Sequence, residues 1–179
     1  MDLEKQVNEM QNQLNKLKPG QENQVSMVVF SGDLDKLLAS LIIATGSAAM
    51  GMKVVLFYTF WATASLRDKK KTVKGKDFMS KMFGFMLPKG SSQAKLSKMN
   101  MAGAGTAMLK GLMKKKNVQS VEQLLDLAAQ LDVQINICEM SMDLMGFKRE
   151  EMIDYPNLKY CGVATFLAEA QKSKVQLFV

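Results

Sequence analysis

Hydrophobic positions near the N-terminus repeat with the spacing of a coiled-coil helix. The apolar residues are separated by 4, 3, 4 and 3 positions, at Leu3, Val7, Met10, Leu14 and Leu17. This seam predicts one amphipathic helix within residues 1–20, which Pro19-Gly20 ends. A helix this short is marginally stable alone. We therefore expect self-association through the seam, with packing on the rest of the chain as the alternative.

From Gln24 onward, short apolar runs alternate with helical stretches. Residues 25–30 and 53–60 are rich in β-branched side chains and predict buried strands. Residues 34–50 between them predict a helix with Asp33 as its N-cap. Strand, helix and strand in this length form a βαβ unit with parallel strands. The pattern predicts one α/β domain over residues 24–179, which carries a basic excursion at about residues 67–116.

The same alternation continues in the C-terminal third. Ser120 starts an amphipathic helix, and residues 133–138 predict a strand followed by a helix that Ser141 caps. Residues 160–163 predict a short strand or a turn, residues 164–172 a helix and residues 175–179 a terminal strand.

Residues 37–64 contain a single charge, Lys53, and have the hydropathy of a membrane span. However, their periodicity changes from helical to strand-like near Met50-Gly51. A buried helix followed by a fully buried strand gives the same hydropathy. We interpret the stretch as core rather than as a transmembrane helix.

Positive charge is concentrated in residues 67–116. This segment has fourteen basic and two acidic residues, so it carries +12 and leaves −5 for the rest of a +7 chain. It is interpreted as a solvated excursion, with docking to an acidic protein or to an anionic membrane surface as the alternatives. Lysine dominates, and its aromatic residues Phe78, Phe83 and Phe85 are expected to be packed, so no nucleic acid is expected as a partner.

Methionine is abundant in the same segment and around the second half of the chain. Seven lie within residues 76–116 and four more near Cys138, at Met79, Met82, Met86, Met99, Met101, Met108, Met113, Met140, Met142, Met145 and Met152. We expect adaptable core packing. A soft docking surface and thioether ligation of Cu(I) are the alternatives.

The 179-residue chain contains no histidine, which excludes Ser-His-Asp and Cys-His catalysis and imidazole-based zinc sites. Its two cysteines form neither a CxxC pair nor a metal knuckle, and no secretory segment is evident. These features favour a cytoplasmic protein with reduced thiols, with membrane association as the open alternative. No metal or other cofactor is expected, and the first βα turn lacks the G-x-G-x-x-G pattern of a dinucleotide site.

Cys138 is the main candidate for covalent chemistry. It ends a predicted strand and precedes a helix, and open α/β folds place their chemistry at this edge of the sheet. The amides of a helix N-terminus favour a thiolate, whereas Glu139 and Asp143 oppose it, with Asp143 expected in the first turn of the helix. Sulfur transfer between thiols tolerates this balance because it needs a thiolate and an accessible approach but no dedicated base. A buried core cysteine is the alternative.

Cys161 has weaker signals. Its surroundings are typical of packing at the last crossover, and a role as resolving or partner thiol is the alternative.

Residues 138–146, supported by residues 96–105 and 162–167, resemble the DsrE/DsrF-like family. The similarity is to its larger subfamily, whose members are often called sulfurtransferases or peroxiredoxin-like proteins. The resemblance covers the chain after Gln24 and implies a three-layer α/β/α fold with a mostly parallel sheet of about five strands. It also implies that Cys138 carries a persulfide and exchanges it with TusA-type or rhodanese-type proteins. Cys161 matches no cysteine that the family requires.

Three functions are therefore compared. The first is a sulfur carrier, or sulfurtransferase-type protein, that forms a homo-oligomer through its N-terminal helix and core domain. Ser141, Asp143, Gly146 and Cys161 are its candidate supporting residues. The second is a non-catalytic module that docks a protein or a membrane, with Cys138 in the core. The third is a thiol peroxidase-like oxidoreductase, although no Thr-x-x-Cys pattern surrounds either cysteine.

Overall fold

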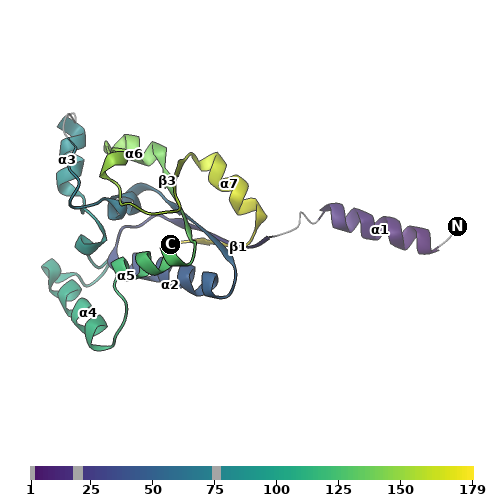
Figure 1. Ribbon diagram of the computed structural model, residues 1–179, viewed down its shortest axis with the longest axis horizontal. Helices are drawn as coiled ribbons and strands as arrows, with labels where there is room; N and C mark the ends of the chain where they lie inside the picture. The colour runs from purple at the N-terminus through teal and green to yellow at the C-terminus, as the bar shows by residue number, and fades with distance from the viewer. Residues whose placement is uncertain (1–2, 18–21, 74–77) are drawn as a thin grey trace.

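The structure, a computed structural model, describes residues 3–17, 22–73 and 78–179. Within these ranges a five-stranded parallel sheet forms the centre, with the strand order β4-β3-β2-β1-β5. The strands are β1 (Glu22–Val29), β2 (Lys53–Tyr58), β3 (Gln134–Cys138), β4 (Leu158–Cys161) and β5 (Ser173–Phe178). Helices lie on both faces of the sheet (Figure 1), so the predicted three-layer α/β/α architecture is confirmed.

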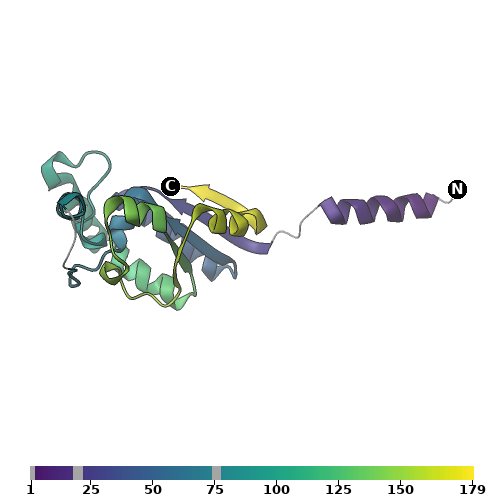
Figure 2. The same cartoon turned by 90° about the horizontal axis from the view of Figure 1, so that it is seen from above.

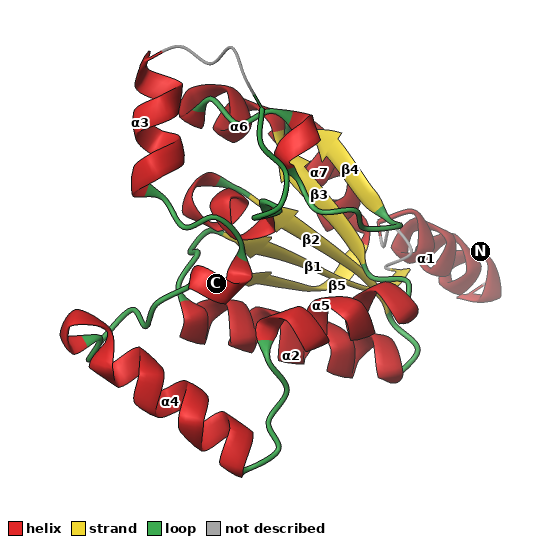
Figure 3. Ribbon diagram, turned by 60° about the vertical axis from the view of Figure 1, so that its left-hand side comes forward, coloured by secondary structure: helices red, strands yellow, loops and turns green. Residues whose placement is uncertain are grey.

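The helices cover the two faces unequally. Helix α2 (Leu34–Ala49) connects β1 to β2, and α5 (Val121–Gln130) precedes β3; the two pack side by side on one face (Figure 3). Helix α7 (Val163–Lys172) connects β4 to β5 and packs on the opposite face. Helix α6 (Glu139–Met145) follows β3 beyond the carboxyl edge of the sheet.

Alternating strand residues fill two separate cores. Met27, Leu56 and Ile135 are fully buried on the face that α2 and α5 cover. On the other face, Phe57 stacks on Phe166 of α7 with ring centroids 4.7 Å apart. Each fully buried side chain of this size contributes about 1.5–3 kcal/mol to folding. The parallel sheet thus has the near-continuous apolar strands that double coverage requires.

Residues 37–64 are accounted for by this core. They form most of α2, then β2 and most of a 3-10 helix, η1 (Phe60–Leu66), so the interpretation as buried helix and strand is confirmed. In the described part of the chain, none of the helices combines the length and the apolar character that a membrane span needs. The second strand is shorter than predicted because the chain turns at Phe60, whose φ is +45°.

The basic segment, residues 67–116, contains α3 (Phe78–Met86) and α4 (Ala104–Lys115). Its one arginine, Arg67, is buried and lies 3.3 Å from the carboxylate of Glu151. The same guanidinium lies 4.6 Å from the centroid of the Phe147 ring and donates to the carbonyl of Gly84. Removing one partner of such a buried ion pair typically costs about 3–5 kcal/mol. This pair therefore anchors the excursion to the domain.

Two expectations for this segment are wrong. Of its methionine side chains that the structure describes, Met82, Met86, Met99, Met101 and Met108 are exposed rather than packed in the core, while Met113 is buried. The side chain of Met79 lies outside the described residues. Phe78 and Phe85 are also exposed, whereas Phe83 is half-buried. The reason is that α3 and α4 lie at the periphery of the molecule (Figure 1), where few neighbours reach them. Near Cys138, core packing is correct for Met142, Met145 and Met152, whereas Met140 is exposed.

Helix α1 (Leu3–Leu17) matches the predicted N-terminal helix. It stands apart from the sheet and its helices in two perpendicular views (Figures 1 and 2). Val7 and Met10, two residues of the apolar seam, are exposed. Self-association through this seam remains a prediction. The Pro19-Gly20 end of the helix lies outside the described residues.

Candidate functional site

The two cysteines are the last residues of neighbouring strands. Cys138 ends β3, Cys161 ends β4, and the parallel pairing places them directly opposite each other in register. Paired strands lie about 4.8 Å apart. Both cysteines pack against the same cluster beneath α7, which includes Val55, Phe57 and Phe166. The two thiols are therefore neighbours on one face of the sheet, and both are free.

Their exposure differs. Cys138 is 3% exposed, whereas Cys161 is half-buried. A pocket of about 430 Å³ lies along β4 and α7, and its walls include Lys53, Gln134, Asn136, Lys159, Cys161 and Glu169. Cys138 does not line this β4–α7 pocket. The expected accessible approach to Cys138 is thus absent in this conformation, because Cys138 lies in the cluster beneath α7 while Cys161 faces the pocket.

The β4–α7 pocket is polar but nearly balanced in charge. Lys53 Nζ lies 3.2 Å from the carboxylate of Glu169. Lys159 Nζ donates to the side-chain oxygen of Gln134 at 3.1 Å. Glu139 forms an ion pair with Arg149. Because these charged groups are already paired or hydrogen-bonded, the pocket suits a polar ligand of low net charge.

The surroundings of Cys161 hold its thiol in the neutral form. Burial raises the pKa of the Cys161 thiol, and neighbouring Cys138 and Glu139 raise it further, while Lys159 acts in the opposite direction. At neutral pH the thiolate of Cys161 is consequently a minor species. Because the thiolate is the nucleophile, reaction at Cys161 is limited by its deprotonated fraction.

Ser141 does not cap the helix after β3, contrary to the prediction. Helix α6 begins at Glu139, three residues earlier than a helix capped by Ser141 would, and Cys138 itself occupies the N-cap position. The buried Ser141 hydroxyl instead accepts from the Phe60 amide at 3.0 Å and lies 2.9 Å from the Thr59 hydroxyl. Ser141 therefore ties α6 to the start of η1 and supports the edge of the sheet indirectly.

Asp143 and Gly146 are placed by the same early helix start. Asp143 lies in the second turn and is exposed, so Glu139 is the acidic residue of the first turn. Gly146 ends α6 with φ of +66°, and a Cβ atom there would collide with Ser80 of α3. The glycine is thus required by the turn and by the close approach of α3.

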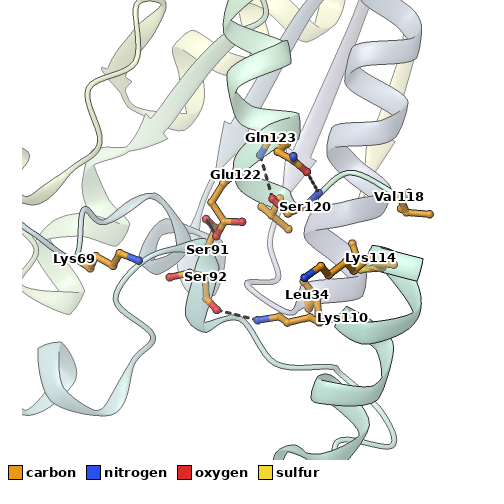
Figure 4. A pocket seen from close by; sticks show the side chains of 12 residues that line it. Leu34, Lys69, Ser91, Ser92, Lys110, Lys114, Val118, Ser120, Glu122 and Gln123 are labelled. Carbon is orange, nitrogen blue, oxygen red and sulfur yellow. Dashed lines mark hydrogen bonds between the residues drawn. The ribbon is translucent and has the colours of Figure 1, made fainter. Parts of the chain in front are cut away.

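A larger cavity of about 560 Å³ lies at the starts of α2 and α5 (Figure 4). Its lysines include Lys110, which donates to the Ser92 carbonyl at 2.8 Å. Glu122 accepts from the Ser91 hydroxyl at 2.9 Å. Burial raises the pKa of Glu122. Hydrogen bonds from its own backbone amide, Ser91 and Ser120 nevertheless hold this pKa below its usual range. Neither cysteine lines this cavity, so the thiol chemistry belongs elsewhere.

The chemistry available near the β4–α7 pocket comes from the thiols. Among the residues that the structure describes, no group of three or more Cys, Asp or Glu side chains could hold a metal ion. Two adjacent thiols can exchange a sulfane sulfur with each other, or form a disulfide by exchange with an oxidised disulfide partner. Both reactions proceed without a histidine base.

Cys161, which lines the β4–α7 pocket, is indicated only weakly by the sequence. Like Cys138, it ends a strand and precedes a helix, but the short run around it also fitted a turn. Consecutive parallel strands are usually neighbours in a sheet. Assigning residues 160–163 as a strand would therefore have placed both cysteines at the carboxyl edge of the sheet. That shared position was the signal available in the sequence.

Comparison with known proteins confirms the resemblance seen in the cysteine tract. The family described as DsrE/DsrF/DrsH-like matches residues 21–178. The chain is 43% identical over 159 residues to the uncharacterized protein YrkE of Bacillus subtilis (strain 168), covering 89% of this chain and 98% of that protein. It is 30% identical over 162 residues to the sulfur carrier protein DsrE2 of Allochromatium vinosum, covering 89% of this chain and 99% of that protein.

Proposed function

Because the chain belongs to the DsrE/DsrF/DrsH-like family, we propose that it is a sulfur carrier that holds a persulfide on Cys138. The observation that carries the proposal is a free thiol at the carboxyl end of β3, inside the matched region. A relative that aligns over nearly its whole length is named a sulfur carrier. Membership of the family supports a sulfur-carrier function, and Cys138 supplies the sulfur atom to which the transferred sulfur would bind.

The transfer is an exchange of one S–S bond for another. The Cys138 thiolate attacks the outer sulfur of a donor persulfide, the donor S–S bond breaks, and the donor thiolate leaves with the electron pair. Attack on the resulting Cys138 persulfide by an acceptor thiolate reverses the process. No net oxidation occurs and no side-chain base is required, which suits a chain without histidine. TusA-type and rhodanese-type proteins are the proposed partners.

Loading with inorganic polysulfide tests this function. After excess donor is removed, the intact mass of the folded protein is expected to rise by the mass of one sulfur atom, and peptide mapping should place it on Cys138. The Cys138→Ser variant should lack that modified peptide. A folded wild-type protein whose Cys138 gains no sulfur would contradict the proposal.

The burial of Cys138 favours a second candidate, a docking module in which this cysteine is only core. Alkylation distinguishes the two functions. A core cysteine reacts with iodoacetamide only after unfolding and also stays unmodified by polysulfide. A carrier cysteine takes up sulfur in the folded protein, even where a bulkier alkylating reagent reacts slowly.

A further inference from the structure

A second thiol lies beside Cys138 and faces the pocket that Cys138 does not reach. Cys161 is the register partner of Cys138 and lines the β4–α7 pocket. Phe57 and Phe166 pack in the same cluster as Cys138, which is 3% exposed. A donor that enters the pocket therefore meets Cys161 before it meets Cys138.

We propose that Cys161 is the receiving thiol of the site, which accepts sulfane sulfur in the β4–α7 pocket and passes it to Cys138. This inference rests on the proposed function and adds the residue that meets the donor. It assigns the buried cysteine to storage and the half-buried cysteine to exchange.

The register of the two strands makes direct transfer feasible. Neighbouring strands lie about 4.8 Å apart, and Cα atoms of disulfide-bonded cysteines are usually about 4.4–6.8 Å apart. Cys138 and Cys161 are paired Cα for Cα and pack on the same cluster. Their sulfur atoms can therefore both reach a shared sulfur atom without a change in strand pairing.

The pocket has the size and polarity for a small persulfide donor. Its volume of about 430 Å³ falls within the range of small-molecule sites. Lys159 lies on the same strand as Cys161 and lowers the pKa of its thiol, against the larger effects of burial and of Cys138. The Thr165 and Asn136 side chains add polar groups to the walls. The persulfide of a small thiol peptide, which carries positive and negative charges and amide groups, fits such a surface.

Both steps conserve electrons. First, the Cys161 thiolate attacks the outer sulfur of the donor persulfide R–S–SH, so a Cys161–sulfur bond forms and R–S⁻ leaves. Next, the Cys138 thiolate attacks that outer sulfur. The bond to Cys161 breaks, its electron pair returns to the Cys161 sulfur, and that sulfur takes up a proton. The products are a Cys138 persulfide and a Cys161 thiol, with no reductant or oxidant consumed.

The test is time-resolved loading of the full chain with glutathione persulfide, quenched by an alkylating reagent and read by peptide mass. In the wild type, sulfur should appear on Cys161 first and on Cys138 later. In Cys138→Ser it should remain on Cys161. In Cys161→Ser the rate of loading of Cys138 should fall by about tenfold or more, because the adjacent donor is lost. Leu167→Ala, a change at an exposed position of α7 outside the pocket, should load like the wild type.

The outcomes separate the two proposals. Loading of Cys138 in Cys161→Ser at the wild-type rate overturns the role of Cys161 and leaves the carrier function intact. Absence of sulfur on Cys138 in the folded wild type overturns both. Circular dichroism checks that each variant folds. If Cys161→Ser does not fold, the order of labelling in the wild type decides, and sulfur on Cys138 before Cys161 overturns the inference.

Discussion

Cys138 and Cys161 occupy the same place in their strands, yet their surroundings differ. Cys138 is enclosed by the apolar cluster beneath α7, whereas Cys161 faces charged and polar groups of the pocket. Glu139 on α6 and Lys159 on β4 act on the pKa of Cys161 in opposite directions. Across the pocket, Lys53 of β2 and Glu169 of α7 are paired with each other. The reactivity of Cys161 is therefore set by burial and by few charges.

Alkylation of Cys161 in the wild type is expected to have a midpoint at higher pH than that of a free cysteine, about 8.5. Burial, Cys138 and Glu139 raise the pKa of this thiol, so it stays protonated and unreactive further into the alkaline range. Peptide-resolved alkylation by iodoacetamide across pH measures this. Glu139→Gln removes a negative charge and should lower the midpoint, whereas Lys159→Met should raise it.

The raised pKa of Cys161 also sets how the stability of the folded protein depends on pH. A thiol whose folded pKa is raised contributes stability at pH values below its unfolded pKa, and this contribution is lost as pH rises through the folded pKa.

An alkylation midpoint of Cys161 at or below that of a free cysteine would contradict the prediction. So would an unchanged midpoint in both charge variants.

At the level of elements, the end of α6 determines how the helix fits against α3. Gly146→Ala is expected to destabilise the protein more than Gly51→Ala. Both glycines have positive φ, which costs about 1–2 kcal/mol for a residue with a Cβ atom. A Cβ at Gly146 also collides with Ser80, which adds about 1–3 kcal/mol. At Gly51 a Cβ would meet nothing within 4 Å. Urea unfolding of both variants measures the difference.

Equal losses of unfolding free energy in the two variants would show that only the backbone conformation matters at Gly146. A smaller loss at Gly146 than at Gly51 would contradict the packing of α6 against α3. The comparison needs no assumption about sulfur chemistry, because both substitutions lie outside the β4–α7 pocket.

The elements of the sheet domain were predictable because their signals are local. Apolar runs such as residues 53–58 and the capping box of Ser120 and Gln123 specify strand and helix directly. The start of α6 was not predictable, since Ser141 resembles an N-cap while Cys138 takes that position without a side-chain cap. Burial of Cys138 and exposure of the methionines depend on which surfaces tertiary packing covers. The pairing of the two cysteines depends on strand order.

At the scale of the whole molecule, α1 offers an apolar seam that the rest of the chain leaves exposed at Val7 and Met10. The double variant Val7→Glu/Met10→Glu is expected to lower the oligomeric state. Charges in an a/d seam oppose the helix pairing that buries it. Light scattering coupled to size-exclusion chromatography measures the mass of each protein.

Asn8→Glu/Gln11→Glu is the matched control, because it adds the same charge to exposed positions of α1 outside the seam. This control should keep the wild-type mass. If the seam variant also keeps it, any assembly of the protein does not depend on α1. A monomeric wild type would contradict self-association altogether.

The position of β4 bears on how long the proposed carrier keeps its sulfur. As one of the two outer strands of the described sheet, β4 is joined to it on one side only, through β3. Outer strands detach by local opening at a lower free energy than global unfolding requires. Such an opening frees Cys161 while Cys138 stays with β2 and β3. If Cys138 stores sulfur and Cys161 exchanges it, as proposed, the sulfur on Cys138 is held for as long as the domain stays folded, whereas Cys161 is released whenever the four-residue β4 opens.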